Sequence, residues 1–476
     1  MSLDALETVV RLSWVLGAAL FVVGLHQMNS PATARQGNRL SAVGMTIAVV
    51  STAVLLVARF NVEPIGWVIL VVGLALGGGL GLWMAKTVKM TAMPQLVSLF
   101  NAVGGGAAAL IAIDDYIRLS RLGLAVPLET TVFTVLDVII GSVTFSGSLI
   151  ASGKLQGVVT SRPVVFPFSR IINVALVAVA LAGAFFLFAG NVSVAVLFAI
   201  IAMSLVFGVT LVMPIGGADM PVVISLLNSF TGTAVAMAGV VISNPMLIIA
   251  GALVGASGGI LTKLMADAMN RSIVNIMVGG FGTGDAAAGA VVTAVGGSAA
   301  NIREVTADDA AIMLAYAQRV IIVPGYGLAV AQAQHACREL GDLLEQRGVD
   351  IKYAIHPVAG RMPGHMNVLL AEANVPYPQL VEMDDINPEF DRCDVALVVG
   401  ANDVTNPAAR SNPQSPIYGM PILDVDHAAN IIVIKRSMRP GYAGIDNELY
   451  TNPKCGMLFG DAKAALEQLI AAVKAL

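Results

Sequence analysis

The feature that most constrains the fold of this chain is an abrupt change in polarity near residue 270. Before that point charged side chains are sparse, whereas after residue 301 they return at the density of a soluble protein. Over the whole chain 57% of residues are hydrophobic and 12% are charged, against roughly 25% charged in an ordinary soluble domain. We therefore expect a membrane-spanning region at 1–270, a Gly/Ala-rich linker at 271–301 and a soluble domain at 302–476.

Apolar runs in the first half are long enough to cross a membrane as helices, since a bilayer core needs about 20 apolar residues per helix. Nine runs reach this length, near 5–26, 38–59, 64–85, 94–113, 130–152, 170–190, 192–213, 220–242 and 245–266. The first half is thus expected to be an all-α polytopic bundle of about nine helices. An odd number of crossings puts the two termini on opposite sides of the bilayer.

The distribution of Lys and Arg predicts which side each terminus occupies. Alternate loops carry Arg35, Arg39, Lys86, Lys89, Lys154, Arg162, Arg170, Lys263 and Arg271. The opposite loops carry only Arg59, Arg118 and Arg121. The positive-inside bias then places the soluble domain in the cytoplasm. The N-terminus lacks the basic region of a cleaved signal peptide, so the first run is expected to be a retained helix.

Charge and cysteine content exclude some classes of function. The net charge of −4 gives no indication of a nucleic-acid partner. The three cysteines, Cys337, Cys393 and Cys455, lie far apart in the soluble half and form no metal-binding motif. We therefore expect no metal site, and a reducing compartment for the soluble domain.

Polar residues inside the apolar runs must find partners away from lipid. Asn101, Ser148 and Asn228 are each either hydrogen-bonding groups between helices or members of a proton path. Asp137 is the costliest to bury, so it is expected to be paired or functional. Asp219 stands at an N-cap position, where capping and function are equally good interpretations.

The second half alternates strands and helices. Apolar strand runs occur at Val320–Val323, Ile351–Ile355, Val395–Val399, Ile431–Ile434 and Met457–Phe459, with a weaker one near Leu380–Met383. Helices fit at Asp308–Ala317, Ala329–Gln346, Pro363–Ala373 and Asp461–Leu476. This alternation predicts an α/β Rossmann-like, doubly wound parallel sheet, whose ligand lies at the carboxyl ends of the strands.

The first of these strands runs into a glycine turn typical of dinucleotide sites. Gly325, Tyr326 and Gly327 would let a pyrophosphate approach the following helix, which includes Ala329 and has Val330 where the usual motif has a third glycine. The acidic residue that binds the ribose in a standard NAD site is missing from the end of the second strand. The sequence therefore predicts a nucleotide site that is not the standard NAD site.

Later strands supply other candidate ligands. Lys435, Arg436 and Ser437 follow Ile431–Ile434 and suit a phosphate monoester such as the 2′-phosphate of NADP, although a solvated basic pair is the alternative. Gly400, Ala401, Asn402 and Asp403 follow another strand and offer polar groups to a nicotinamide or ribose. Gly441, Tyr442 and Ala443 lie in a long loop that is a candidate mobile lid.

Together these residues resemble the β subunit of proton-translocating NAD(P) transhydrogenase over nearly the whole chain. Further matching motifs are Arg361-Met362-Pro363-Gly364, Gly460-Asp461 and Leu227-Asn228-Ser229. The resemblance implies that the soluble domain binds NADP(H), with the nucleotide reversed relative to the usual Rossmann orientation. It implies that hydride comes from NADH on one or more alpha subunits, which also add membrane helices, and that the alpha/beta unit dimerises in the bacterial inner membrane.

The resemblance also assigns roles to single residues. Asp403 matches a carboxylate that couples nucleotide binding to proton movement, and Asn228 matches a polar residue of the proton path. Hydride transfer needs apposed nicotinamide rings and no catalytic side chain. Where this chain has Asn101, the family often has a His. Our hypothesis is that a partner-helix His packs near Asn101 and Asn228; the alternatives are Asp137, or water held by groups such as Asn228 and Ser148.

Two other functions fit a membrane bundle joined to a nucleotide fold. The first is a transporter or channel gated by a nucleotide-sensing domain, but no TVGYG-like filter occurs and a sensor has no need of a 2′-phosphate site. The second, a quinone-linked dehydrogenase, would need a flavin, haem or iron–sulfur signature, and the sequence contains none that we recognise.

Overall fold

A computed structural model describes residues 3–59, 62–122, 126–160, 163–216, 219–270, 272–274, 276, 302–360, 362, 364–415, 417–441 and 443–476. These residues divide into two compact units. The first contains everything described up to Lys263, together with Val274 and Ile276. The second contains the described residues from Leu264 to Ile273 and from Ile302 to Leu476. Nearly all of the predicted linker at 271–301 lies outside the described residues.

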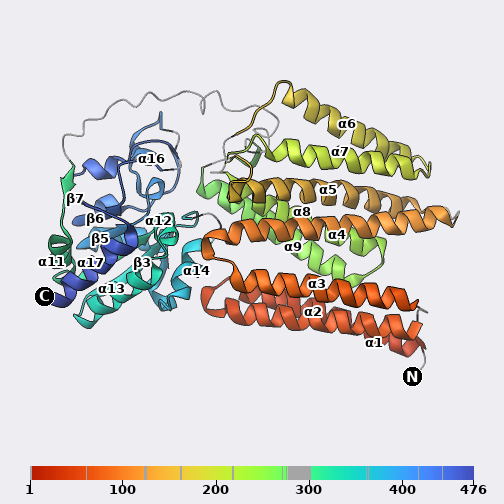
Figure 1. The fold of residues 1–476 in the computed structure, drawn as a ribbon, viewed down its shortest axis with the longest axis horizontal. Helices are drawn as coiled ribbons and strands as arrows, with labels where there is room; N and C mark the ends of the chain where they lie inside the picture. The colour runs from red at the N-terminus through yellow and green to blue at the C-terminus, as the bar shows by residue number, and fades with distance from the viewer. Residues whose placement is uncertain are drawn as a thin grey trace. The chain divides into compact units, whose positions relative to one another are not determined.

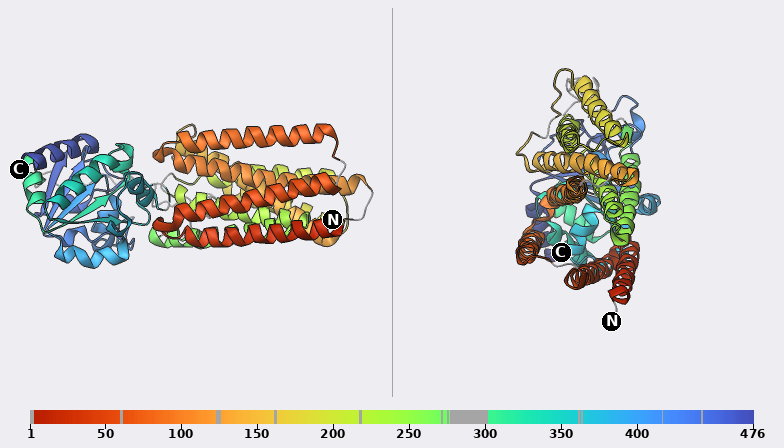
Figure 2. Two further views of the ribbon diagram at one scale, coloured as in Figure 1. Left: turned by 90° about the horizontal axis from the view of Figure 1, so that it is seen from below. Right: turned by 90° about the vertical axis from the view of Figure 1, so that its right-hand side faces the viewer.

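The first unit consists of helices that run side by side (Figures 1 and 2). Nine helices among the described residues are long and apolar enough to cross a membrane, which confirms the predicted bundle. They are α1 (Leu3–Gln27), α2 (Pro31–Arg59), α3 (Pro64–Thr87), α4 (Met93–Arg121), α5 (Leu128–Gln156), α6 (Ser169–Phe188), α7 (Val194–Val212), α8 (Met220–Val241) and α9 (Pro245–Ala268). Several of these helices are longer than the predicted apolar runs, because their last turns contain charged residues, such as Arg118 and Arg121 in α4.

Small residues bring the central helices into backbone contact. A Cβ atom added to Gly141 of α5 would lie 2.6 Å from the carbonyl oxygen of Gly105 in α4, so only glycine allows this approach. Helices α5 and α8 are the most enclosed, each with 61% of an apolar 18-residue stretch buried, whereas α3 has no buried residue in the described structure. The polar residues of α5 are therefore shielded from lipid by other helices.

The second unit is built on a sheet whose seven described strands are all parallel. They are β1 (Arg303–Glu304), β2 (Arg319–Pro324), β3 (Asp350–Ile355), β4 (Leu380–Glu382), β5 (Val395–Val399), β6 (Asn430–Lys435) and β7 (Cys455–Phe459). Their order is β1-β7-β6-β5-β2-β3-β4. The chain builds outward from β2 to β4 and then returns to place β5 against the other side of β2. The sheet therefore has a switch point between β2 and β5, where doubly wound folds bind ligands.

Helical layers cover both faces of the sheet. Side chains alternate along each strand, so Ile321 and Val323 of β2 face one layer while Val320 and Ile322 face the other. The first layer contains α15 (Met383–Ile386) and short 3₁₀ turns that include Phe390 and Leu449. The second contains α11 (Ala307–Ala315), α13 (Gln334–Gln346) and α17 (Ala462–Ala475). This arrangement confirms the predicted α/β class.

The predicted strands agree with the structure to within about two residues, but two details were wrong or missed. The edge strand β1 was not predicted. The single helix expected at Ala329–Gln346 is two helices, α12 (Tyr326–Val330) and α13, because the chain turns at Gln332, which has a φ of 51°. The predicted helix at Pro363–Ala373 is observed as α14 (His365–Glu372).

Candidate nucleotide-binding cleft

A cleft of about 480 Å³ lies at the carboxyl ends of the central strands of the second unit. It extends from the switch point between β2 and β5 across β6 to the start of α17. Its lining residues are Gly327, Ala331, Gly400, Ala401, Asn402, Ile434, Lys435, Arg436, Ser437, Arg439, Pro440, Gly441, Gly460, Asp461 and Ala462. The lining is therefore drawn from four separate turns that follow parallel strands.

Two glycine turns cross backbone to backbone at the switch point. The amide of Gly327 donates to the carbonyl of Gly400 at 2.9 Å. A Cβ atom on Gly400 would lie 2.5 Å from the Cα of Gly327, and Gly400 also has a φ of +71°. Both close approach and left-handed conformation therefore require glycine here. The cleft floor consists of main chain, which allows a ligand to approach closely.

The cations at the end of β6 lie at different depths. Arg436 and Ser437 are exposed where they line the cleft, whereas Lys435 is half-buried, with its Nζ 4.6 Å from the centre of the Tyr450 ring. Burial lowers the pKa of Lys435, although the nearby carboxylates of Asp403 and Asp446 act in the opposite direction. The cleft therefore presents positive charge along one wall, as an anionic ligand requires.

An oriented amide, that of Asn402, lies beside these cations, because Tyr450 contacts both Lys435 and Asn402. The Tyr450 hydroxyl donates to Oδ1 of Asn402 at 2.7 Å, and Nδ2 of Asn447 donates to the same atom at 3.2 Å. Both contacts identify this atom as the amide oxygen. Nδ2 of Asn402 is buried and has no hydrogen-bond partner among the described residues. The amide nitrogen thus lies against Gly441 of the cleft lining, while Tyr450 and Asn447 hold the amide oxygen.

The loop that follows β6 lines one side of the cleft through Arg439, Pro440 and Gly441. Hydrogen bonds hold it to the segment that follows β5. Ala443 donates its amide to Oδ2 of Asp403 at 3.0 Å. Beside it, Gly441 approaches so closely that an added Cβ would lie 2.7 Å from Oδ1 of Asp403. At the far end of the loop, the buried Asn406 donates from Nδ2 to the carbonyl of Asp446 at 3.1 Å. Asp403 therefore joins the loop after β5 to the loop after β6.

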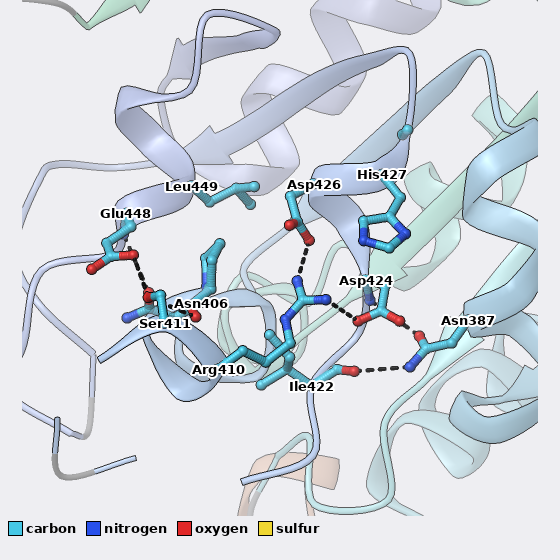
Figure 3. A network of polar contacts seen from close by, with 12 residues as sticks. Asn387, Asn406, Arg410, Ser411, Ile422, Asp424, Asp426, His427, Glu448 and Leu449 are labelled. Atoms are coloured by element: carbon cyan, nitrogen blue, oxygen red, sulfur yellow. Dashed lines mark hydrogen bonds and ion pairs between the residues drawn. The ribbon is translucent and has the colours of Figure 1, made fainter. Parts of the chain in front are cut away.

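A polar network braces the segment that follows Asp403 (Figure 3). Arg410 lies between two carboxylates, with Nη1 2.9 Å from Asp424 and Nη2 2.6 Å from Asp426. The side chain of Asn387 accepts from the amide of Asp424 at 3.1 Å and donates to the carbonyl of Ile422 at 3.0 Å. These contacts brace the chain between the β5 turn and β6.

These features fit a dinucleotide phosphate. A buried amide donor with no partner among the described residues, a floor of glycines and a row of cations meet in one cleft. The N-terminus of α17 also reaches the cleft through Gly460 and Ala462, and helix N-termini favour anions. Asp461 is the N-cap of that helix, and its carboxylate accepts from the amide of Lys463 at 3.1 Å.

The structure brings together many of the residues that the sequence singled out. Nine of the predicted binding residues line the cleft: Gly327, Gly400, Ala401, Asn402, Lys435, Arg436, Ser437, Gly441 and Asp461. The described residues that do not line it are Gly325, Tyr326, Ala329, Val330, Met362, Gly364, Asp403 and Ala443. Arg361, Pro363 and Tyr442 lie outside the described residues.

Some of the predicted residues lie in the structure away from the cleft lining. Ala329 is buried in the core and Val330 is exposed. The Tyr326 ring lies 6.1 Å from the His365 ring, which places α12 beside the start of α14. Six lining residues were not predicted to bind a ligand: Ala331, Ile434, Arg439, Pro440, Ala462 and Gly460, which was named only in a motif of the resemblance. Arg439 lies three residues after the predicted cation Arg436, so its charge was the signal that could have identified it.

The polar residues predicted in the membrane unit are mostly enclosed. Asn101 of α4 is buried and donates to the carbonyl of Ile224 in α8 at 3.3 Å. Asp137 and Ser148 of α5 are fully buried, and Asn228 of α8 is half-buried. Asp219 occupies the N-cap position of α8 but makes no side-chain capping hydrogen bond.

Comparisons with known proteins match the chain along nearly its whole length. A family model described as NAD(P) transhydrogenase beta subunit matches residues 10–472. Two proteins of Rhodospirillum rubrum, one of them from strain ATCC 11170, are each named NAD(P) transhydrogenase subunit beta. Each is 48% identical to this chain over 467 residues, which cover 97% of this chain and 98% of the relative. These matches do not favour the gated transporter considered above.

Proposed function

The chain belongs to the NAD(P) transhydrogenase beta subunit family, and on this premise we propose that its α/β unit binds NADP(H) in the cleft at the switch point. In this proposal an alpha subunit holds NAD(H), so that hydride passes between two nucleotides on different polypeptides. The chain is thus one half of an oxidoreductase, and the beta-subunit family itself implies an alpha-subunit partner.

The observation that carries the proposal is the row of cations at the end of β6. Lys435, Arg436 and Ser437 line the same cleft as the main-chain floor at Gly327 and Gly400. Two cations and a hydroxyl suit a phosphate monoester, which NADP carries and NAD lacks. At the end of β3, where a standard site has a ribose-binding carboxylate, the chain instead has His356, which is buried and bonded to the carbonyl of Pro421 at 2.9 Å.

The residues of the cleft bind and orient rather than react. The nicotinamide ring supplies the hydride chemistry, which needs apposition of two rings and no acid or base from the protein. Asn402 offers its amide Nδ2 to the ligand, because Tyr450 and Asn447 occupy its oxygen. The glycine floor admits the ligand, and the loop 436–447 excludes water from one side.

We place the coupling of hydride transfer to proton movement at Asp403 and in the membrane unit. Asp403 holds the cleft loop through the amide of Ala443, so a change at this carboxylate would alter how tightly the cleft is covered. The candidate proton-path residues remain Asn101, Asp137, Ser148, Asp219 and Asn228. The proposal includes a homodimer of the alpha/beta unit in a bacterial inner membrane, with the α/β domain in the cytoplasm.

A hydride-transfer assay tests the proposal. Membranes that contain this chain and its alpha partner should reduce an NADP analogue with NADH, and proton uptake or release should accompany the reaction. The purified chain alone should show no transfer, because it contains one nucleotide site and the reaction needs two nicotinamides. Transfer by the purified chain without a partner, or none with it, would refute the proposal.

A further inference from the structure

A single carboxyl group inside the membrane unit lacks the partners that such a group normally needs. Asp137 of α5 is completely buried, and neither of its carboxylate oxygens has a hydrogen-bond partner among the described residues. The neighbouring Thr134, one turn away, is also fully buried and its Oγ1 is likewise unpartnered within the described structure. An ionised carboxylate without a cation or donors is very costly in such surroundings, so the group is held there as the neutral acid.

Charged groups on the surrounding helices do not supply a counter-ion. On α4 they are Asp114, Asp115, Arg118 and Arg121; on α5 they are Glu129 and Lys154; on α6 there is Arg170; α7 has none; and Asp219 precedes α8. Arg118 is paired with Asp115 at 2.6 Å, and its side chain is 67% exposed. Lys154 lies about 25 Å further along α5 at 1.5 Å per residue, where it donates to the carbonyls of Met213 and Ile215.

Asp137 lies on a continuous polar face of α5. Gly141, Thr144, Ser148 and Ser152 follow it at spacings of three or four residues, which places all five on one side of the helix. Gly141 approaches Gly105 of α4, and a Cβ on Gly105 would lie 2.9 Å from Thr144. This face is therefore the seam between α4 and α5, away from lipid.

Hydroxyl and amide groups follow one another along this seam toward the end of α5. Ser98 of α4 donates to the carbonyl of Ser148 at 2.8 Å. One turn on, Ser152 donates to the carbonyl of Gln95 at 3.0 Å. Gln156 then donates to the hydroxyl of Ser152 at 3.3 Å. The positive-inside bias assigns this end of α5 to the cytoplasm.

We propose that Asp137 is a proton-binding carboxyl of this chain, and that the α4–α5 seam through Ser148 and Ser152 connects it to one face of the membrane. A carboxylate oxygen of Asp137 takes one proton to form the neutral acid and later returns the same proton. The step therefore consumes no other reactant. This inference rests on the proposed function in one respect, namely that the transhydrogenase reaction drives the proton transfer.

The test uses the complete complex of this chain with its alpha partner, reconstituted in vesicles. Asp137→Asn keeps the shape of the neutral acid but cannot release a proton. We expect it to lower NADH-driven proton pumping by about a hundredfold, as loss of a positioned proton-transfer group does, while NADP(H) binding stays unchanged. Asp137→Glu should restore part of the pumping. Ser146→Ala is the matched control, because Ser146 is buried on the face of α5 that meets α7 and bonds only the carbonyl of Ser142 in the described structure.

A chemical measurement on the unmutated complex tests protonation independently of activity and of the stability of the variants. A hydrophobic carbodiimide forms a stable adduct with a protonated carboxyl and not with a carboxylate. Peptide mapping by mass spectrometry should find the adduct on Asp137 at neutral pH. Normal pumping by Asp137→Asn, or an unmodified Asp137, would overturn the inference. If the unmutated complex transfers no hydride, the proposed function fails, whereas the carbodiimide result still decides the protonation of Asp137.

Discussion

The hydroxyl of Tyr450 donates to Oδ1 of Asn402 across 2.7 Å, although the two residues are 48 positions apart. Burial raises the pKa of Tyr450, so its hydroxyl keeps its proton and acts as a donor at neutral pH. The bond directs the Asn402 amide nitrogen away from Tyr450. Tyr450→Phe should therefore weaken NADP(H) binding by about 1 kcal/mol, the net contribution of one hydrogen bond. Calorimetry on residues 302–476 measures this, and unchanged affinity would show that the amide is held by Asn447 alone.

An exposed cation of the cleft lining, Arg436, should determine nucleotide preference. Arg436→Ala is expected to weaken NADP(H) binding by about 1.5–3 kcal/mol, the range for a hydrogen bond to a charged group, and to leave NAD(H) binding nearly unchanged. Titration of the 302–476 fragment with both nucleotides checks this. Arg392→Ala provides the control, because Arg392 is exposed and does not line the cleft. Equal binding of both nucleotides by the unmutated fragment contradicts the assignment.

The glycine crossing at the cleft floor should tolerate no side chain. Gly400→Ala places a Cβ 2.5 Å from the Cα of Gly327 at a left-handed backbone position. We expect it to reduce the free energy of unfolding by about 3 kcal/mol, from backbone strain and overpacking together. Gly348→Ala has a φ of +90° but open space around the added Cβ, and should cost only about 1 kcal/mol. Thermal unfolding measures both variants. If they lose similar amounts of stability, the close contact between Gly400 and Gly327 is not confirmed.

One buried histidine should make the stability of the α/β unit depend on pH. The carbonyl of Pro421 can only accept from Nε2 of His356, and the amide of Val358 donates to its Nδ1 at 3.2 Å, so the ring is neutral. Burial lowers the pKa of His356 to about 4, from 6.5 when unfolded. As pH falls through this interval, the unfolded state binds a proton that the folded state excludes. This difference removes up to about 3 kcal/mol of stability.

The measurement for His356 is denaturant unfolding of the 302–476 fragment at several pH values between 4 and 7. His356→Gln should flatten the dependence on pH, because glutamine does not titrate. His427→Gln is the control, since the His427 side chain is 41% exposed and faces Asp391. A variant at position 356 with the same slope as the unmutated fragment would show that other groups cause the loss. The fragment begins at 302 so that it retains β1, which pairs with β7.

The sequence predicted those helices and strands that are marked by a hydrophobic pattern in their own residues. Continuous apolar runs identified the membrane helices and the buried strands, since both kinds of element are expected to have apolar surroundings, lipid or protein, on all sides. Strand β1, with two residues, is too short for any pattern. The break after α12 was missed because Ala331, Gln332 and Ala333 all favour helix. There the amide of Ala333 bonds back to the carbonyl of Leu328 at 3.1 Å and ends the helix.

The cleft was predictable only where its residues follow strands. Lys435 comes directly after the apolar run Ile431–Ile434 and Asn402 three residues after Val395–Val399, so the parallel sheet brings them to one edge. Arg439 and Pro440 lie in an irregular loop whose course depends on tertiary contacts such as that of Ala443 with Asp403. The orientation of the Asn402 amide depends on Tyr450, a pairing that no local spacing reveals.

The main-chain floor of the cleft has a consequence for how such a protein can change over evolutionary time. Gly327 and Gly400 set the shape of the floor and also hold two strand ends together, so substitution there disturbs folding itself. Arg436 and Ser437 are exposed, so substitution there alters what the cleft prefers while the core stays intact. Selection can therefore change the nucleotide preference through a few exposed positions, without first requiring substitutions that make the fold more stable.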